Sequence, residues 1–265
     1  MLVIFSDLDG TMLDARTYSY EEAKPALARL RQKKIPLILC TSKTRVEVNH
    51  LRNEMGCAHP YLAENGAVAV IPASYFPPGS SDGMHVNNDL VVRFGSSYQS
   101  VVTALRAASL ASGVPVRGFS QMTAKELAEL TGLDLPSAAR ALQRDHDEPF
   151  LIAGPHSAEP LLQAITALGK RWTRGGRFFH VTDQLDKGAA ARYLIRRYRQ
   201  YYGEVTTVAL GDAMNDLPLL RVCDRAIVVQ SDQATALLEQ LPGAELTALP
   251  GPRGWSHAVL RLPCP

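Results

Sequence analysis

Two aspartates stand two positions apart directly after the first apolar run of the chain. The run Leu2–Phe5 leads into Ser6–Thr11, which reads SDLDGT and contains Asp7 and Asp9. A short apolar run that ends at a turn signal is typical of a buried parallel strand, and ligands bind at the carboxyl ends of such strands. Both carboxylates are therefore aimed at one spot, where their repulsion requires a cation or a retained proton. Mg2+, which prefers oxygen ligands, fits this pattern.

A second acidic loop follows another apolar run about two hundred residues later. Val205–Leu210 leads into Gly211–Asp216, which reads GDAMND. Asp212 and Asp216 offer two more carboxylates, as direct ligands or in an outer shell, and the Asn215 amide can orient one of them. Taken alone, this loop is also compatible with a simple turn that carries local side-chain hydrogen bonds. Together with the two N-terminal aspartates, it predicts a metal site of four carboxylates.

Hydroxyl side chains follow a third apolar run, Ile35–Cys40. Thr41 or Ser42 can hold a phosphate oxygen there, assisted by backbone N–H groups at a helix start and by the charge of Lys43. The alternative is an ordinary helix N-cap made by Ser42 or Thr44. Both interpretations can hold at once.

Lys187 precedes a helical pattern over Ala189–Tyr198. At the start of that helix it brings a fixed positive charge toward the same edge of the sheet. A lone lysine at a helix start is usually solvated, so this interpretation depends on the acidic motifs around it.

These motifs, in this order, resemble the haloacid dehalogenase superfamily of phosphohydrolases. The matching segments are Asp7–Thr11, Thr41, Lys187 and Gly211–Asp216. The resemblance implies that Asp7 is a nucleophile that forms an aspartyl-phosphate, and that Asp9 protonates the leaving oxygen and then activates water. Phosphoryl transfer needs positioning and charge neutralisation above all, and a carboxylate nucleophile divides it into two steps.

Length and composition agree with an enzyme of this class. The 265 residues are 46% hydrophobic and carry a net charge of +2, which argues against a nucleic-acid or membrane partner. No apolar run approaches the roughly 20 residues that span a bilayer, so we expect a cytoplasmic protein. The four cysteines lack paired spacing, so neither a zinc site nor a disulfide framework is predicted, and Cys40 is assigned to the core.

The order of expected elements predicts an α/β fold with an insertion. Residues 1–82 and 187–265 are predicted to form a doubly wound, Rossmann-like parallel sheet, the latter with Ala226–Val229 as its last strand. Residues 83–186 are predicted to form an α+β cap, because the texture changes after the Pro- and Gly-rich stretch 72–88. A cap between Thr41 and Lys187 would cover the catalytic edge, exclude water and select the substrate.

Within the cap we expect an alternation of strands and helices. The expected elements are a strand over Leu90–Phe94, helices over Ser97–Ser112, from the capping box at Thr123 to Gly132, over Pro136–Arg144 and over Glu159–Leu168, a strand over Phe150–Ala153, and a hairpin with arms Trp172–Thr173 and Phe178–Val181.

Further segments resemble one family of this superfamily, the mannosyl-3-phosphoglycerate phosphatases. They are Leu39–Arg45, His59–Gly66, Asp147–Phe150, Gly175–His180 and Gly251–Trp255. The resemblance implies hydrolysis of mannosyl- or glucosyl-3-phosphoglycerate to the glycosylglycerate, and it adds Glu64, Asn65 and Asn215 to the substrate-binding residues. The alternatives are a sugar-phosphate phosphatase of broad specificity, a phosphomutase, or a sensor of sugar phosphates without catalytic activity.

The hairpin turn of the cap offers a second anion site. A phosphoglycerate glycoside carries a carboxylate besides its phosphate, and Arg174 and Arg177 can bind it through a bidentate fork. Gly175 and Gly176 between them let backbone N–H groups approach an anion. The alternative is an exposed basic turn.

Three other cap features receive a more ordinary interpretation. His180, beside two phenylalanines, is expected to be a packed core residue. The run Asp145–Glu148 is expected to be a solvated acidic loop, in which Glu148 alone is assigned a contact with a sugar hydroxyl.

Overall fold

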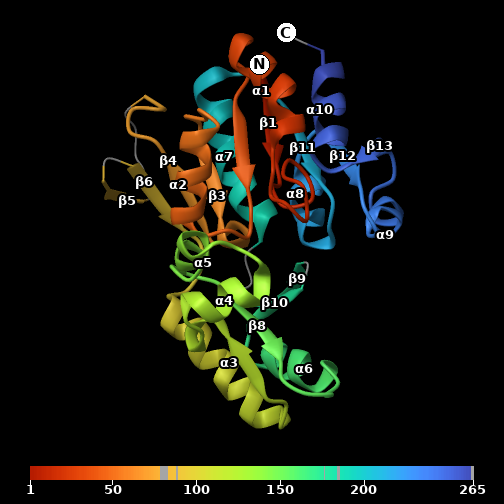
Figure 1. Cartoon of the computed structure of the whole chain (residues 1–265). Helices are drawn as coiled ribbons and strands as arrows, with labels where there is room; N and C mark the ends of the chain where they lie inside the picture. Colours follow the sequence, from red (N-terminus) through yellow and green to blue (C-terminus); the bar gives the residue numbers. More distant parts are fainter. Residues whose placement is uncertain (78–82, 88, 176, 184–185, 264–265) are drawn as a thin grey trace.

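The computed structural model describes residues 1–77, 83–87, 89–175, 177–183 and 186–263. Figure 1 shows a large α/β domain and a smaller cap domain. The cap lies below the sheet edge where β1 (Leu2–Ser6) and β11 (Thr206–Gly211) end. The chain passes into the cap after β6 and returns from it before α7. The predicted combination of an α/β core with an inserted cap is confirmed.

The large domain is built on one sheet with the strand order β13-β12-β11-β1-β2-β3-β4-β6-β5. The strands from β13 to β3 are parallel, and β4, β6 and β5 are added in antiparallel fashion. Their bounds are β1 Leu2–Ser6, β2 Leu37–Cys40, β3 Tyr61–Ala63, β4 Val68–Ile71, β5 Met84–Val86, β6 Asp89–Arg93, β11 Thr206–Gly211, β12 Arg225–Gln230 and β13 Glu245–Pro250.

The antiparallel part of the sheet corrects the predicted domain boundary. Only residues 64–67 separate β3 from β4, which is too short for the crossover that a parallel pair needs. β6 then pairs with β4, with Val91 opposite Val70. The first core segment therefore extends to Arg93 and does not end at residue 82, because the strand expected at the start of the cap completes the large sheet.

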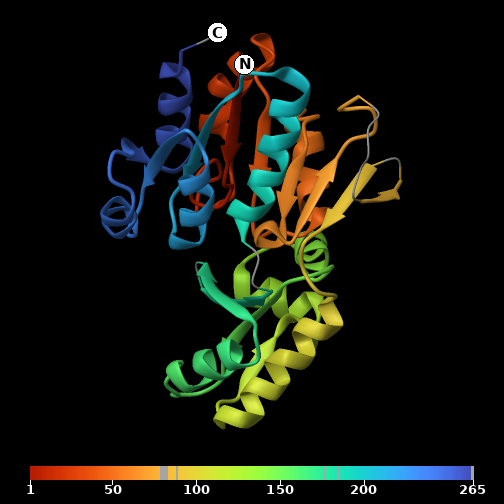
Figure 2. The same ribbon diagram turned by 180° about the vertical axis from the view of Figure 1, so that it is seen from behind.

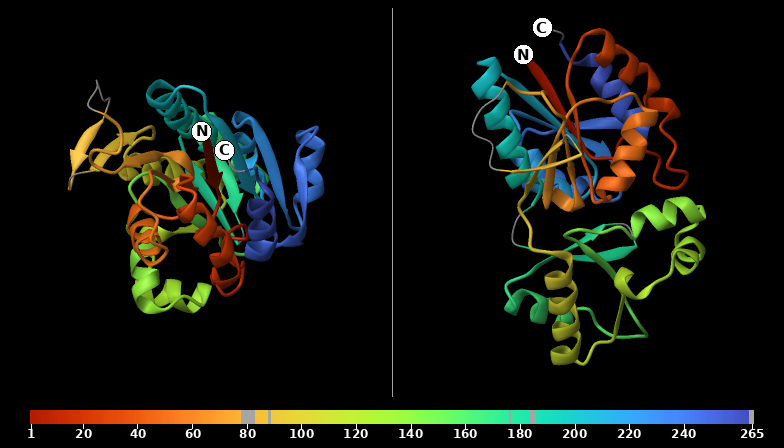
Figure 3. Two further views of the ribbon diagram at one scale, coloured as in Figure 1. Left: turned by 90° about the horizontal axis from the view of Figure 1, so that it is seen from above. Right: turned by 90° about the vertical axis from the view of Figure 1, so that its left-hand side faces the viewer.

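Helices cover both faces of the large sheet, as a doubly wound fold requires. Figure 2 shows α7 crossing one face, and Figure 3 shows α1 and α10 on the other. Each face of the sheet has its own hydrophobic core, and alternate β1 side chains enter one or the other. Ile4 belongs to the core that includes side chains of α1, α2 and α10, and Phe5 belongs to the core that includes side chains of α7, α8 and α9. The helices are α1 Lys24–Gln32, α2 Arg45–Glu54, α7 Lys187–Tyr202, α8 Leu217–Val222, α9 Ala234–Gln240 and α10 Gly251–Arg261.

The C-terminal segment contributes more than the sequence indicated. β13 follows the last strand that the sequence predicts. After it, α10 packs on the sheet beside α1, near the N-terminus of the chain. Trp255 of α10 is fully buried, and its Nε1–H donates to Ser6 Oγ at 2.8 Å. This helix therefore supports the residue that precedes Asp7.

The cap contains a four-stranded antiparallel sheet with the order β7-β8-β10-β9. Helices α3 and α6 pack against it around Phe150 and Val181, and α4 and α5 form a second small core around Phe119. The elements are α3 Tyr98–Ser112, β7 Val116–Gly118, α4 Ala124–Thr131, α5 Leu135–Ala141, β8 Glu148–Ile152, α6 Glu159–Ala167, β9 Arg171–Gly175 and β10 Phe178–Thr182. The predicted helices and the hairpin of the cap are confirmed within a few residues. Among the described residues, no helix is long and apolar enough to cross a membrane.

Candidate active site

Neighbouring strands bring the two acidic motifs together. Asp7 follows β1 and its backbone N–H donates to the carbonyl of Leu210, in the adjacent β11, at 2.9 Å. Asp212 follows β11 on the same edge. Gly10 has φ +84°, and a Cβ at this position would lie 2.5 Å from Asp212 Oδ2. The turn after β1 therefore needs glycine both for its backbone conformation and for the close approach of the second motif.

Three carboxylates gather at this edge. Oxygens of Asp7, Asp212 and Asp216 lie within 4.8 Å of one another. Burial, followed by the neighbouring Asp216, raises the pKa of Asp7 well above its ordinary value. The same two causes raise the pKa of Asp212 to about 7. A cluster of buried acids that repel one another in this way fits a hard divalent cation, which would stabilise all of the ionised forms.

Lys187 supplies a fixed charge inside the cluster. Its Nζ lies 2.6 Å from Asp7 Oδ1 and 2.6 Å from Asp216 Oδ1, and the side chain is 1% exposed. Burial alone lowers the pKa of Lys187, but the carboxylates of Asp216 and Asp7 outweigh burial and raise it. Gly188 lets the start of α7 lie close to α8, because a Cβ at this position would lie 2.4 Å from the carbonyl oxygen of Pro218. The lysine is therefore held as an ammonium ion against Asp7.

Asp216 has both carboxylate oxygens engaged. Oδ1 accepts from Lys187, and Oδ2 accepts from the backbone N–H groups of Asp212 and Ala213, each at 3.1 Å. These contacts orient the lysine and the loop that carries Asp212. The sequence left open whether Asp216 binds the metal directly or lies in an outer shell. Because both of its oxygens already accept hydrogen bonds, the contacts favour the outer shell.

Asp9 lies outside the carboxylate cluster. Its Oδ1 is 2.9 Å from Lys43 Nζ, and its side chain is 34% exposed. The cluster of side-chain carboxylates among the described residues has three members and does not include Asp9, so a metal site of four carboxylates stays a prediction. Burial lowers the pKa of Lys43, but Asp9 outweighs it and the net shift is upward.

The three hydroxyl residues that follow β2 make different contacts. Thr44 is the N-cap of α2 and forms a capping box with Glu47, so Ser42 is not the cap. Thr41 is buried, and its Oγ1 accepts from the backbone N–H of Lys43 at 3.1 Å. The carbonyl of Ser42 accepts from Arg144 of the cap at 2.7 Å.

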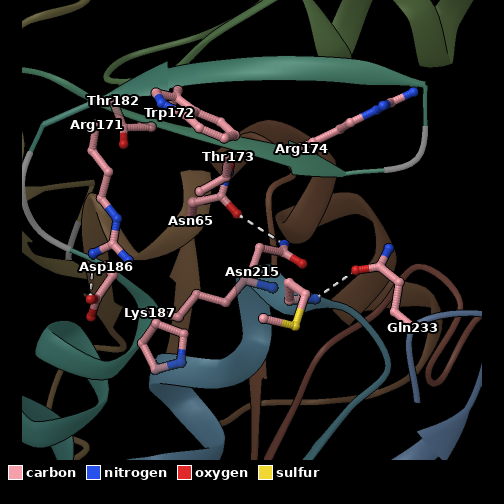
Figure 4. A pocket seen from close by; sticks show the side chains of 12 residues that line it. Asn65, Arg171, Trp172, Thr173, Arg174, Thr182, Asp186, Lys187, Asn215 and Gln233 are labelled. Atoms are coloured by element: carbon pink, nitrogen blue, oxygen red, sulfur yellow. Dashed lines mark hydrogen bonds and ion pairs between the residues drawn. The ribbon is translucent and has the colours of Figure 1, made fainter. Parts of the chain in front are cut away.

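A cavity of about 530 Å³ separates the cap strands from the core loops (Figure 4). Its walls come from β9 and β10 above, and from the start of α7 and the loop before α8 below. The lining residues are Asn65, Arg171, Trp172, Thr173, Arg174, Thr182, Asp186, Lys187, Met214, Asn215, Pro218 and Gln233. Asn65, Arg174 and Asn215 were predicted to bind substrate, and the structure brings them together here beside Lys187.

The two arginines of the cap turn have different surroundings. Arg174 lines the cavity, with its guanidinium 5.2 Å from the ring centre of Phe179. Arg177 is exposed, and its guanidinium donates to the carbonyl of Leu130 at the end of α4. Arg177 does not line the cavity, so a fork made by both arginines stays a prediction. Gly175 ends β9, and Gly176 lies outside the described residues.

Glu148 is committed to the interior of the cap. It is fully buried and accepts hydrogen bonds from the Tyr98 hydroxyl and from the backbone N–H of Ser120. A Cβ at Gly118 would lie 2.1 Å from its Oε1, so the glycine makes room for the carboxylate. The predicted sugar contact is wrong, since Glu148 does not line the cavity.

Glu64 has a structural role as well. It is fully buried and accepts from the backbone N–H groups of Asp145, His146 and Asp147 at 2.7 to 3.1 Å. Burial raises the pKa of Glu64 to about 7. This carboxylate belongs to the core domain and holds a cap segment, so it is not available to a substrate.

Several residues of the site carried no recognisable sequence signal. Arg171 and Thr173 line the cavity together with Trp172 and Arg174 of the same strand, and Arg171 pairs with Asp186 at 2.7 Å. The run Asp145–Glu148 is not the solvated loop that the sequence predicts, because its last three residues are buried. The expected burial of His180 is confirmed, but its ring also contacts Asp147 at 3.0 Å.

Comparison with known proteins agrees with this geometry. Residues 4–75 match the family model described as haloacid dehalogenase-like hydrolase. The chain is 39% identical to a glucosyl-3-phosphoglycerate/mannosyl-3-phosphoglycerate phosphatase of Methanococcoides burtonii, over 98% of this chain and 96% of that protein. It is 34% identical to the protein of the same name from Persephonella marina, over 98% and 97%.

A solved structure shares the fold at low sequence identity. The Thermoplasma acidophilum protein 0175 superposes with a TM-score of 0.68 at 18% identity, over 97% of this chain and 95% of that one. The motif geometry and the full-length similarity to these phosphatases lead to one assignment. The chain belongs to the haloacid dehalogenase-like hydrolases and is a phosphatase.

Proposed function

We propose that this phosphatase hydrolyses glucosyl- or mannosyl-3-phosphoglycerate to the glycosylglycerate and inorganic phosphate. The observation that carries the proposal is the contact between Asp7 and Lys187 at 2.6 Å, because Lys187 lines the cavity between the core loops and the cap strands. The curated relatives named for this activity cover nearly the whole chain and support the choice of substrate.

In the proposed reaction Asp7 attacks phosphorus and forms an aspartyl-phosphate while the ester bond to the glycerate oxygen breaks. Asp9 donates a proton to the leaving alkoxide. Water then attacks phosphorus, Asp9 takes a proton from it, and phosphate leaves with Asp7 restored. Lys187 stays protonated throughout and offsets the charge on the phosphoryl oxygens.

The proposed cofactor is Mg2+. Asp7 and Asp212 would hold it, because Lys187 alone does not offset the burial and the repulsion by Asp216 that raise their pKa values. Asp216 would orient the site through Lys187 and the backbone of the loop. When bound, the ion neutralises phosphoryl oxygen charge and keeps Asp7 ionised.

The cavity has the polar groups that a glycosyl phosphoglycerate needs. Thr173 Oγ1 is buried and has no hydrogen-bond partner within the described part of the chain, so a ligand hydroxyl would satisfy it. Asn65 and Asn215 offer amides at the cavity (Figure 4), and Arg174, which lies in the cavity wall, is the proposed cation for the glycerate carboxylate. A volume near 530 Å³ is within the range of small-molecule sites.

The test is phosphate release from a panel of substrates, with Asp7→Asn as the inactive control. We expect kcat/KM on glucosyl- or mannosyl-3-phosphoglycerate to exceed that on glucose 6-phosphate, mannose 6-phosphate and 3-phosphoglycerate. Equal values across the panel would replace the proposal with a sugar-phosphate phosphatase of broad specificity. Isomerised sugar phosphate without free phosphate would indicate a phosphomutase, and binding without turnover would indicate a sensor.

A further inference from the structure

The connection between α5 and β8 of the cap is anchored in the core domain by buried charges. Arg144 and Asp147 lie in this connection and at its junction with β8, and their side chains are 6% and 0% exposed. Neither residue lines the cavity. Their contacts nevertheless lead to three loops at the catalytic edge of the large sheet.

Arg144 holds the loop that follows β2. Its Nη1 donates to the carbonyl of Ser42 at 2.7 Å, and its Nε donates to the carbonyl of Ala141 within the cap at 2.9 Å. The guanidinium thus joins α5 to the segment that begins with Thr41. A buried guanidinium with fixed acceptors on both sides restricts the position of that backbone.

Asp147 holds the loop that follows β3. Its Oδ2 accepts from the Asn65 amide of the core at 3.0 Å and lies 3.0 Å from the His180 ring of the cap. Its backbone N–H donates to Glu64 at 2.9 Å. Asn65 Oδ1 in turn accepts from Asn215 at 3.4 Å, in the loop that carries Asp212 and Asp216.

We propose that Arg144 and Asp147 are positioning residues for phosphoryl transfer. The proposal rests on the proposed function and deepens it. The pair, whose charges lie 3.6 Å apart, fixes the loop after β2 through Ser42 and the loop after β11 through Asn65 and Asn215. Through this pair the cap contributes to the geometry around phosphorus, although neither Arg144 nor Asp147 contacts the substrate.

This arrangement predicts an effect on the chemical step. A displacement of about 1 Å in groups around a reacting centre can cost roughly 10²-fold in rate. Since neither Arg144 nor Asp147 lines the cavity, substrate binding should depend on the pair much less. A small substrate that lacks both sugar and glycerate should report the same loss as the natural one.

The experiment compares Arg144→Lys and Asp147→Asn with wild type in the full-length enzyme with Mg2+. Arg144→Lys keeps the positive charge and removes the guanidinium fork. Asp147→Asn keeps the size of the side chain and removes its negative charge. The matched control is Arg45→Ala, because Arg45 pairs with Asp145 of the same cap segment at 2.6 Å, but at the half-exposed rim. Turnover of p-nitrophenyl phosphate is measured together with inhibition by orthovanadate, and circular dichroism and thermal unfolding report the folded fraction.

For the two test variants we expect kcat to fall by about 10- to 100-fold, KM to change less than about threefold, and orthovanadate to inhibit more weakly by a similar factor as kcat. The control should keep kcat within about twofold of wild type. Folded test variants with wild-type kcat and wild-type orthovanadate inhibition would overturn the inference. So would a loss confined to KM, or an equal loss in Arg45→Ala.

The design separates this inference from the substrate assignment. If wild type hydrolyses p-nitrophenyl phosphate but no glycosyl phosphoglycerate, the proposed substrate fails, and the kcat losses still support or overturn the role of the pair. If Asp147→Asn does not fold, Arg144→Lys decides by the same criteria.

Discussion

Lys187 Nζ lies 2.6 Å from Asp7 Oδ1, although 180 positions separate the two residues along the chain. The whole cap is inserted between them. The contact depends on two neighbours of β1: β11, which places the second acidic loop beside it, and α7, whose first residue is the lysine. The charge balance at Asp7 is therefore a property of the assembled core domain.

Asp7→Asn should abolish phosphate release while leaving the fold intact. Without metal, it should also raise the melting temperature, because burial and Asp216 make the ionised form of Asp7 unfavourable. Phosphate release and thermal unfolding in EDTA measure the two effects. Near-normal turnover by the folded variant would refute the assigned nucleophile.

Removal of metal should silence the enzyme, and Mg2+ should restore it. Asp212→Asn should weaken this restoration, because one proposed ligand is lost. Ca2+ should support little turnover, since its looser coordination misplaces the groups around phosphorus. The measurement is initial rate against metal concentration, and full activity of a preparation shown to be metal-free would contradict the metal assignment.

Arg174→Ala should lower kcat/KM on a glycosyl phosphoglycerate by roughly 10- to 150-fold, the scale of a charged hydrogen bond of about 1.5 to 3 kcal/mol. Turnover of p-nitrophenyl phosphate should change little, because this substrate has no carboxylate. Arg177→Ala is the matched control, since Arg177 contacts Leu130 away from the cavity. Equal losses in the two variants would show that the turn acts on cap structure alone.

Glu64→Gln should lower the free energy of unfolding by about 2 to 4 kcal/mol, because an amide replaces a buried acceptor that three backbone N–H groups share. Urea unfolding measures the change. Glu126→Gln, an exposed capping-box residue of α4, is the control and should cost less than about 1 kcal/mol. A wild-type midpoint for Glu64→Gln would show that the cap segment is held by other contacts.

Asp147 should make stability depend on pH in the acid range. Burial alone raises its pKa, but His180 and Arg144 outweigh burial and hold the pKa below its ordinary value of 3.8. The stabilisation by this ionised carboxylate is therefore present above about pH 4 and is lost as the pH falls through the lowered value. The difference in unfolding free energy between wild type and Asp147→Asn should shrink from pH 6 to pH 3. An unchanged difference would assign the contribution of Asp147 to its neutral hydrogen bonds.

Local patterns were sufficient for most elements of the fold. Apolar runs located β1, β2 and β11, and the Thr123 capping box with Gly132 set the limits of α4. Such signals reside within a few consecutive residues, so they survive without tertiary context. The placement of β6 in the large sheet was missed, because a strand's sequence does not state which partner it will pair with.

The sequence by itself determined the chemistry of this protein: two acidic motifs, a lysine and a hydroxyl-bearing loop, each at the end of an apolar run. Those residue types define what the site can do wherever the chain brings them together. Only the tertiary structure decided which side chains face the reaction. It buried Glu64 and Glu148, and it placed Arg174, but not Arg177, in the wall of the cavity. The direction of a side chain depends on neighbours far away in sequence, through packing and the pairing of buried charges, and no local pattern contains that information.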